Sequence, residues 1–150
     1  MSYKAPVHLT ALFLTCIISK ASYAQLQVAQ YSYGKSGTEQ FERFEFWTNA
    51  GNHSEILYSY GKDLRKVKLK YLGKSKMNGD SCFEVRFSNN YVLYIVPTEL
   101  SLKVVDSVEK YNKTFSWEYE GPIQGIGTHC DVCAEDANDA MRILRSAYLK

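Results

Sequence analysis

The sequence predicts a mainly β domain, an antiparallel meander of about eight strands that forms a small barrel or a strongly curled sheet. One C-terminal helix is expected to pack on it. Two observations predict the sheet. Apolar and polar residues alternate in several runs, and turn sequences such as Met77-Asn78-Gly79-Asp80 separate these runs at short intervals. Asparagine and glycine favour the positive φ angles of tight hairpins, so consecutive strands are expected to pair with each other.

The alternation assigns an inner and an outer face to each strand, because a period of two leaves one face buried and the other in water. Three runs show it most clearly, with apolar positions at Val67, Leu69, Tyr71, at Phe83, Val85, Phe87, and at Phe115, Trp117, Tyr119. The expected strands are residues 26–34, 41–48, 54–61, 65–73, 81–88, 90–96, 100–106 and 113–120.

The period changes near the C-terminus, where residues 132–148 are expected to form a helix. Ala137, Met141, Leu144 and Tyr148 recur at steps of three and four, which places them on one face. Acidic residues gather at the start of this stretch and basic residues near its end, an order that suits the helix dipole.

Residues 1–24 are typical of a secretory signal peptide. Lys4 precedes an apolar stretch, and Ser22-Tyr23-Ala24 supplies small residues at the positions that a signal peptidase reads. The predicted mature chain is a single domain, residues 25–150, that is secreted or periplasmic. Thr15 is a poor residue before a lipidated cysteine, so Cys16 is expected to leave with the leader.

Charge excludes one broad class of partner. The chain has 18 basic and 16 acidic residues, and the leader contains Lys4 and Lys20 but no acid. The mature chain therefore has no net charge, whereas nucleic-acid binding needs a marked positive excess. No other apolar run reaches the length of a transmembrane segment.

Three cysteines remain after the leader: Cys82, Cys130 and Cys133. An oxidising compartment favours disulfides, and the odd count leaves one thiol over. Cys82 shares its strand face with Glu84 and Arg86, the outer face. The first prediction is a bond from Cys82 to Cys130 or Cys133, which would hold the helix against the sheet. A local Cys130–Cys133 bond is the alternative.

The segment His129-Cys130-Asp131-Val132-Cys133 also allows two other interpretations. A C-x-x-C pair before a helix can serve thiol-disulfide chemistry, although the neighbouring acids would raise the thiol pKa. Together with Cys82, the segment could supply three sulfurs and one nitrogen to zinc. Because a secreted protein usually oxidises such thiols and the second half of a zinc pattern is missing, no metal or other cofactor is predicted.

Two groups of residues are candidate binding sites. Lys66, Lys68 and Lys70 share one strand face and form a positive stripe, which would suit an acidic partner. The favoured interpretation is a solvated face that discourages edge pairing. The abundant aromatic residues either fill the core or line a cavity, since an eight-stranded barrel can hold one small ligand. Tyr58, Tyr60 and Trp117 are the aromatic candidates.

No catalytic motif is present: there is no Gly-x-Ser-x-Gly, His-Glu-x-x-His or phosphate-binding glycine loop. The outline resembles a lipocalin-like barrel, but the Gly-x-Trp expected near the first strand is missing, so no family is assigned. The sequence predicts a non-catalytic binding module for an unknown small ligand or protein. The alternatives are an extracytoplasmic inhibitor or toxin-immunity protein, and a thiol-disulfide redox protein.

Overall fold

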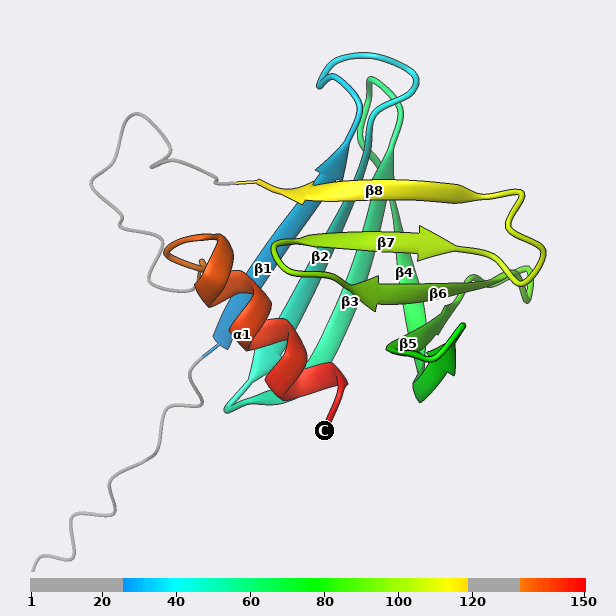
Figure 1. The fold of residues 1–150 in the computed structure, drawn as a ribbon. Coiled ribbons are helices and arrows are strands. Elements are labelled where there is room, and N and C mark those ends of the chain that lie inside the picture. The colour runs from blue at the N-terminus through cyan, green and yellow to red at the C-terminus, as the bar shows by residue number, and fades with distance from the viewer. Residues whose placement is uncertain (1–25, 119–132) are drawn as a thin grey trace, which may run out of the picture.

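The computed structural model describes residues 26–118 and 133–150. These residues form eight antiparallel strands and one helix (Figure 1). Their bounds are β1 (Leu26–Tyr33), β2 (Glu42–Asn49), β3 (Asn52–Tyr60), β4 (Arg65–Met77), β5 (Asp80–Arg86), β6 (Val92–Pro97), β7 (Ser101–Val105), β8 (Asn112–Trp117) and α1 (Ala137–Tyr148). The strands pair in sequence order and close into a barrel. The predicted fold class is confirmed.

Tight turns connect β2 to β3 and β4 to β5, as the sequence predicted. Asn78 and Gly79 both adopt positive φ angles, 52° and 91°, between β4 and β5. Ala50 and Gly51 do the same between β2 and β3, with φ angles of 49° and 78°. Two consecutive positive φ angles twist the chain in the sense that two-residue hairpins require.

A bulge extends β4 beyond its predicted end at residue 73. The register with β5 shifts between Tyr71 and Gly73, after which pairing continues to Met77 opposite Asp80. Gly73 has a φ of 130°, which a residue with a side chain rarely adopts. The glycine that suggested the end of the strand is therefore the point at which the strand bends and continues.

The helix begins at Ala137, five residues later than predicted. The Asp136 side chain caps it by accepting a hydrogen bond from the Asp139 amide at 2.8 Å. Before this cap, Cys133 forms a bridge to Val28 of β1, and the Ala134 amide donates to the Val28 carbonyl. Extended pairing with β1 thus replaces the first expected turn of helix.

Side chains from all around the barrel fill its interior. Phe44, Phe46, Phe83 and Phe115 are at most 1% exposed and join a chain of ring contacts 5.0 to 5.8 Å long. The Tyr148 ring of α1 stacks on Phe83 at 5.1 Å. The aromatic inner positions therefore form a packed core, which was one of the two interpretations of the sequence.

Helix α1 lies against one end of the barrel, beside β1, β2 and β3 (Figure 1). The Tyr71 hydroxyl donates to the Tyr148 carbonyl, and Arg145 donates to the carbonyls of Pro97 and Thr98 in the β6–β7 turn. We call this the helix end. The opposite end, formed by the turns at residues 34–41, 61–64, 87–91 and 106–111, is called the distal end.

Candidate functional site

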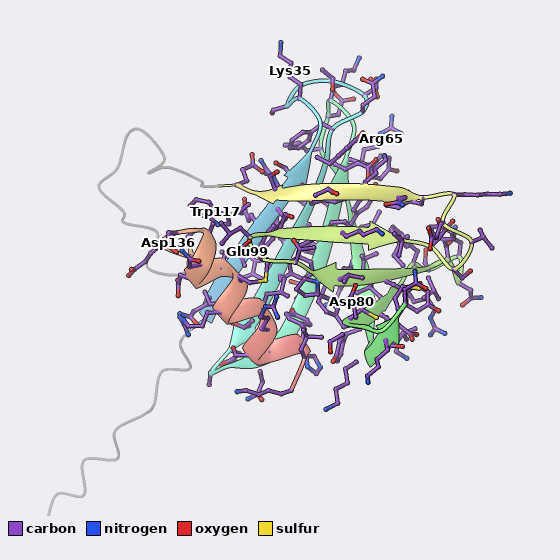
Figure 2. All side chains as sticks on the ribbon, in the orientation of Figure 1. Lys35, Arg65, Asp80, Glu99, Trp117 and Asp136 are labelled. Carbon is purple, nitrogen blue, oxygen red and sulfur yellow. The ribbon has the colours of Figure 1, made fainter. Side chains whose placement is uncertain are left out.

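The distal end collects most of the exposed large apolar side chains among the residues that the structure describes. Seven such side chains are exposed, and five of them lie at this end: Tyr33, Tyr60, Leu64, Tyr91 and Val108. Leu72 lies on the β4 bulge and Leu100 in a turn of the helix end. Figure 2 shows Lys35 and Arg65 at the distal end, well separated from Glu99 and Asp136 near the helix.

A carboxylate lies inside this aromatic rim. Glu42 is the first residue of β2 and is 8% exposed. It follows the same alternation as Phe44 and Phe46, so its side chain belongs to the inner face of the barrel. One carboxylate oxygen accepts a hydrogen bond from the Tyr111 hydroxyl, and the other contacts the Lys113 ammonium. A buried carboxylate needs such partners, because desolvation without them is costly.

The phenols beside Glu42 remain protonated hydrogen-bond donors. Burial raises the pKa of Tyr111 far above the usual tyrosine range, and the hydrogen bond to Glu42 raises it further. The pKa of Tyr58 is raised for the same reasons, with burial as the larger cause. Two neutral phenols and one ammonium therefore surround the carboxylate.

The Lys113 ammonium lies between two aromatic faces as well as against Glu42. Its Nζ is 4.8 Å from the Tyr33 ring centroid and 4.9 Å from that of Tyr111. Both distances are within the range of cation–π attraction. The strand order explains why these side chains lie together. β8, β1 and β2 are neighbours in the barrel, and these residues lie at the distal ends of those strands. We call Glu42, Tyr33 and Tyr111, the groups around the Lys113 ammonium, the ammonium cage.

A second acid lies next to the cage. Asp106 is 6% exposed, and its carboxylate accepts a hydrogen bond from the Tyr91 hydroxyl at 3.0 Å. Desolvation alone would raise the pKa of Asp106. The Tyr91 hydroxyl and the backbone amides of the following turn outweigh it, so the pKa is lowered. The Asp106 amide donates to the Tyr111 carbonyl, which connects this acid to the cage.

Aromatic rings join the two sides of the distal end. Tyr60 stacks on Tyr58 at 5.8 Å, Tyr58 meets Phe87 edge to face at 5.3 Å, and Phe87 contacts Tyr91 at 6.0 Å. The rings of Tyr60 and Tyr91 at the ends of this row are more than a third exposed. The distal end can thus offer ring faces, phenol donors and carboxylate acceptors to a ligand.

The structure places the candidate residues from the sequence in three separate regions. Tyr58 and Tyr60 lie at the distal end, whereas Trp117 pairs with Tyr31 at the other end of β8. Lys66, Lys68 and Lys70 lie on the outer face of β4. Lys66 pairs with Glu45 at 3.3 Å and Lys68 with Glu55 at 2.7 Å, so neighbouring acids neutralise part of the stripe.

The cysteines differ from the first prediction. Cys82 is a buried free thiol, so its predicted bond to Cys130 or Cys133 is not formed in the structure. Cys133 bridges to Val28 of β1, which is four strands away from the Cys82 strand, β5, in the barrel order. Burial and the charge of Glu84 raise the pKa of the Cys82 thiol. Cys130 lies outside the described residues, so the Cys130–Cys133 bond stays a prediction.

The cleft around Cys82 is a separate feature, with a volume of 390 Å³. It lies near the end of α1 and is lined by Lys74, Ser75, Lys76, Ser81, Cys82 and Leu149. The charges of Glu84 and Asp80 both raise the Cys82 pKa. Burial is the largest cause of the raised pKa, and together with these charges it disfavours a thiolate there.

Sequence reasoning missed Glu42, Asp106 and Lys113. A usable signal exists for two of them: Glu42 is in phase with Phe44 and Phe46, and Lys113 is in phase with Phe115. A charged residue in an inward phase at the end of a strand points to a buried polar contact. Its partner comes from another strand, so the sequence does not name it.

Among residues 26–118 and 133–150, no three His, Cys, Asp or Glu side chains come together as metal ligands. The same part of the chain contains no helix with the length and apolarity needed to cross a membrane. A scan against protein-family models found no matching family, and searches of curated proteins and of solved structures found no match.

Proposed function

We propose that this protein is exported and acts outside the cytoplasm as a non-catalytic binding module, with the distal end as its binding surface. The observation that carries the proposal is the gathering of exposed apolar side chains at that end, with Tyr33, Tyr60 and Tyr91 among them. Tyrosine is favoured at binding surfaces, because its ring supplies contact area and its hydroxyl supplies a hydrogen bond.

The architecture also favours the distal end as the binding surface. Turns held by a rigid sheet are common binding elements, since they vary without disturbing the core. The aromatic core occupies the barrel interior, and α1 covers the helix end. Binding at the distal turns would leave both undisturbed.

Export rests on the leader sequence at residues 1–24, which lies outside the described residues. Intact mass of the protein from its native host should correspond to a chain that begins at Gln25. A full-length chain recovered from the cytosol would contradict export.

A protein-directed inhibitor or immunity protein is the second candidate. The exposed apolar side chains spread over several turns, and protein interfaces are extended surfaces of this kind with aromatic residues at their centres. The thiol-disulfide alternative depends on the Cys130 and Cys133 pair, and Cys130 lies outside the described residues, so this alternative stays a prediction.

Capture from the extracytoplasmic fraction of the native host tests the proposed surface. The bait is the immobilised mature protein, compared with a variant carrying Tyr33→Ser, Tyr60→Ser and Tyr91→Ser. The matched control carries Leu72→Ser and Leu100→Ser, which are equally exposed but lie away from the distal end. Bound material is identified by mass spectrometry, and thermal unfolding confirms that each bait is folded.

The proposal predicts that the tyrosine variant loses a bound molecule that the wild type and the control both retain. Equal retention by all three baits, or loss only in the control, would assign binding to another surface. Captured protein would favour the inhibitor class, and a captured small molecule would favour a carrier.

A further inference from the structure

We infer that the distal end recognises a small organic ammonium ion, for which the Lys113 side chain is an intramolecular stand-in. This inference deepens the proposed function and rests on it. The ammonium cage combines a buried carboxylate with two aromatic faces, and this combination selects an organic cation over an anion or a neutral group.

Lys113 itself demonstrates the fit. Its ammonium contacts Glu42 and lies 4.8 and 4.9 Å from the centroids of Tyr33 and Tyr111. The comparable ion pair on the outer face, between Lys68 and Glu55, has no ring over its ammonium among the described contacts. The distal end therefore offers an ammonium two aromatic rings in addition to a carboxylate counter-ion.

The charges at the distal end also favour a cation. Glu42 and Asp106 are both nearly buried carboxylates, and the lowered pKa of Asp106 keeps it ionised at neutral pH. The Lys113 ammonium forms an ion pair with Glu42. The charges farther out on the turns are exposed and of mixed sign (Lys35, Glu39, Lys62, Asp63, Arg65, Glu109 and Lys110), so water screens them.

A ligand cation can replace the Lys113 ammonium in the cage, because the Lys113 side chain can move out into water. Its side chain is 28% exposed, and its long stem can carry the ammonium outward into water. A ligand with methyl groups on nitrogen would gain ring contacts that the hydrated lysine ammonium lacks. The raised pKa of Tyr111 keeps its phenol neutral, so Tyr111 remains a hydrogen-bond donor to Glu42 when the cation is exchanged.

The test uses choline as the probe and NMR titration of the mature protein as the readout. If Lys113 fills this cage about nine-tenths of the time, its removal should tighten choline binding about tenfold. Lys113→Met should therefore bind choline about tenfold more tightly than the wild type. Lys68→Met, which removes the outer ion pair, should leave the affinity unchanged.

Two further variants locate the binding. Glu42→Gln in the Lys113→Met background should abolish choline binding. Tyr33→Leu removes one ring from a partly exposed position and should weaken choline binding without unfolding the protein. The neutral isostere 3,3-dimethylbutan-1-ol should not compete, because it has the shape of choline without the charge.

The sources of an ammonium are separated by a second titration with N-acetyl-lysine methylamide. Choline binding without lysine binding indicates a free methylated amine, and the reverse indicates a lysine side chain of a partner. If Lys113→Met binds neither probe, or binds the neutral isostere equally well, the inference is wrong and Lys113 only neutralises Glu42. That outcome would not affect the capture experiment, which uses no ammonium probe.

Discussion

The Tyr148 hydroxyl, in the last turn of α1, donates a hydrogen bond to the Trp47 carbonyl at 2.8 Å, with the Glu55 carbonyl 3.2 Å away. These carbonyls lie on β2 and β3, next to the hairpin at the helix end. The same ring stacks on Phe83, and Tyr148 is 1% exposed. A single side chain therefore joins the helix to the core and to the backbone of the barrel.

Substitution of Tyr148 separates these two roles. Tyr148→Phe removes only the hydrogen bond and should lower the free energy of unfolding by about 1 kcal/mol. Tyr148→Ala also removes the buried ring and should lower it by about 3–5 kcal/mol. Urea denaturation followed by circular dichroism measures both. Equal losses from the two variants would mean that the ring adds nothing to the helix contact.

Tyr31 presents the opposite case. Its hydroxyl is fully buried and has no hydrogen-bond partner among the residues that the structure describes. Burial also raises the pKa of Tyr31. Removing an unsatisfied buried hydroxyl relieves its desolvation penalty, so Tyr31→Phe should raise the free energy of unfolding by about 1 kcal/mol. Thermal unfolding would contradict this if the phenylalanine variant melted at a lower temperature.

Ala50 can be improved as a turn residue. It has a φ of 49° in the β2–β3 hairpin, a conformation that disfavours alanine and suits asparagine. Ala50→Asn should raise the free energy of unfolding by about 0.5–1 kcal/mol. Ala50→Val is the matched control and should lower it, because a β-branched side chain is strained at positive φ. A gain from valine would show that the hairpin does not hold this backbone angle.

Asp106 should make the protein sensitive to acid. Its folded-state pKa lies below the ordinary value of about 3.9, so its contribution to stability is present above that pH and is lost as the pH falls toward the folded pKa. Asp106→Asn should reduce the free energy of unfolding at pH 7. The variant should also lose less stability than the wild type as the pH falls below about 4. Asp63→Asn, in an exposed turn at the same end, is the control. Parallel pH profiles for wild type and Asp106→Asn would refute the assignment.

Tyr91 should add sensitivity at high pH. Burial and the Asp106 carboxylate raise the pKa of Tyr91 to about 12. Because the folded-state pKa is the higher one, stability is full below about pH 10 and falls as the pH rises through this range. Tyr91→Phe should reduce the loss of stability at high pH, and ultraviolet difference titration of the variant should show one phenolate fewer near pH 12. Unchanged titration in the variant would contradict the pairing.

The barrel was predictable because it depends on local patterns. The alternation of Val67, Leu69 and Tyr71 marks a half-buried strand, and Asn78-Gly79 marks a hairpin. Closure depends instead on β1 meeting β8, where Tyr31 pairs with Trp117 and Ser32 pairs with Ser116. Such a distant contact has no local signature, so the sequence left open whether the sheet was a barrel or a curl.

The candidate site was only partly predictable for the same reason. Tyr58 and Tyr60 stood out by composition and lie at the distal end. Glu42 and Lys113 come into contact only because β8, β1 and β2 lie side by side in the closed barrel. The lysine stripe was identified correctly as one face of a strand, but the sequence could not show that Glu45 and Glu55 reach it from neighbouring strands.

Site-specific photocrosslinking in the native compartment tests the central claim most directly. A photoreactive phenylalanine analogue replaces Tyr60 at the distal end or Leu100 at the helix end, two residues of similar exposure. Intact mass after irradiation reports any adduct, whether protein or small molecule. The account predicts an adduct from position 60 and none from position 100. An adduct from position 100 alone would place binding at the wrong end of the barrel.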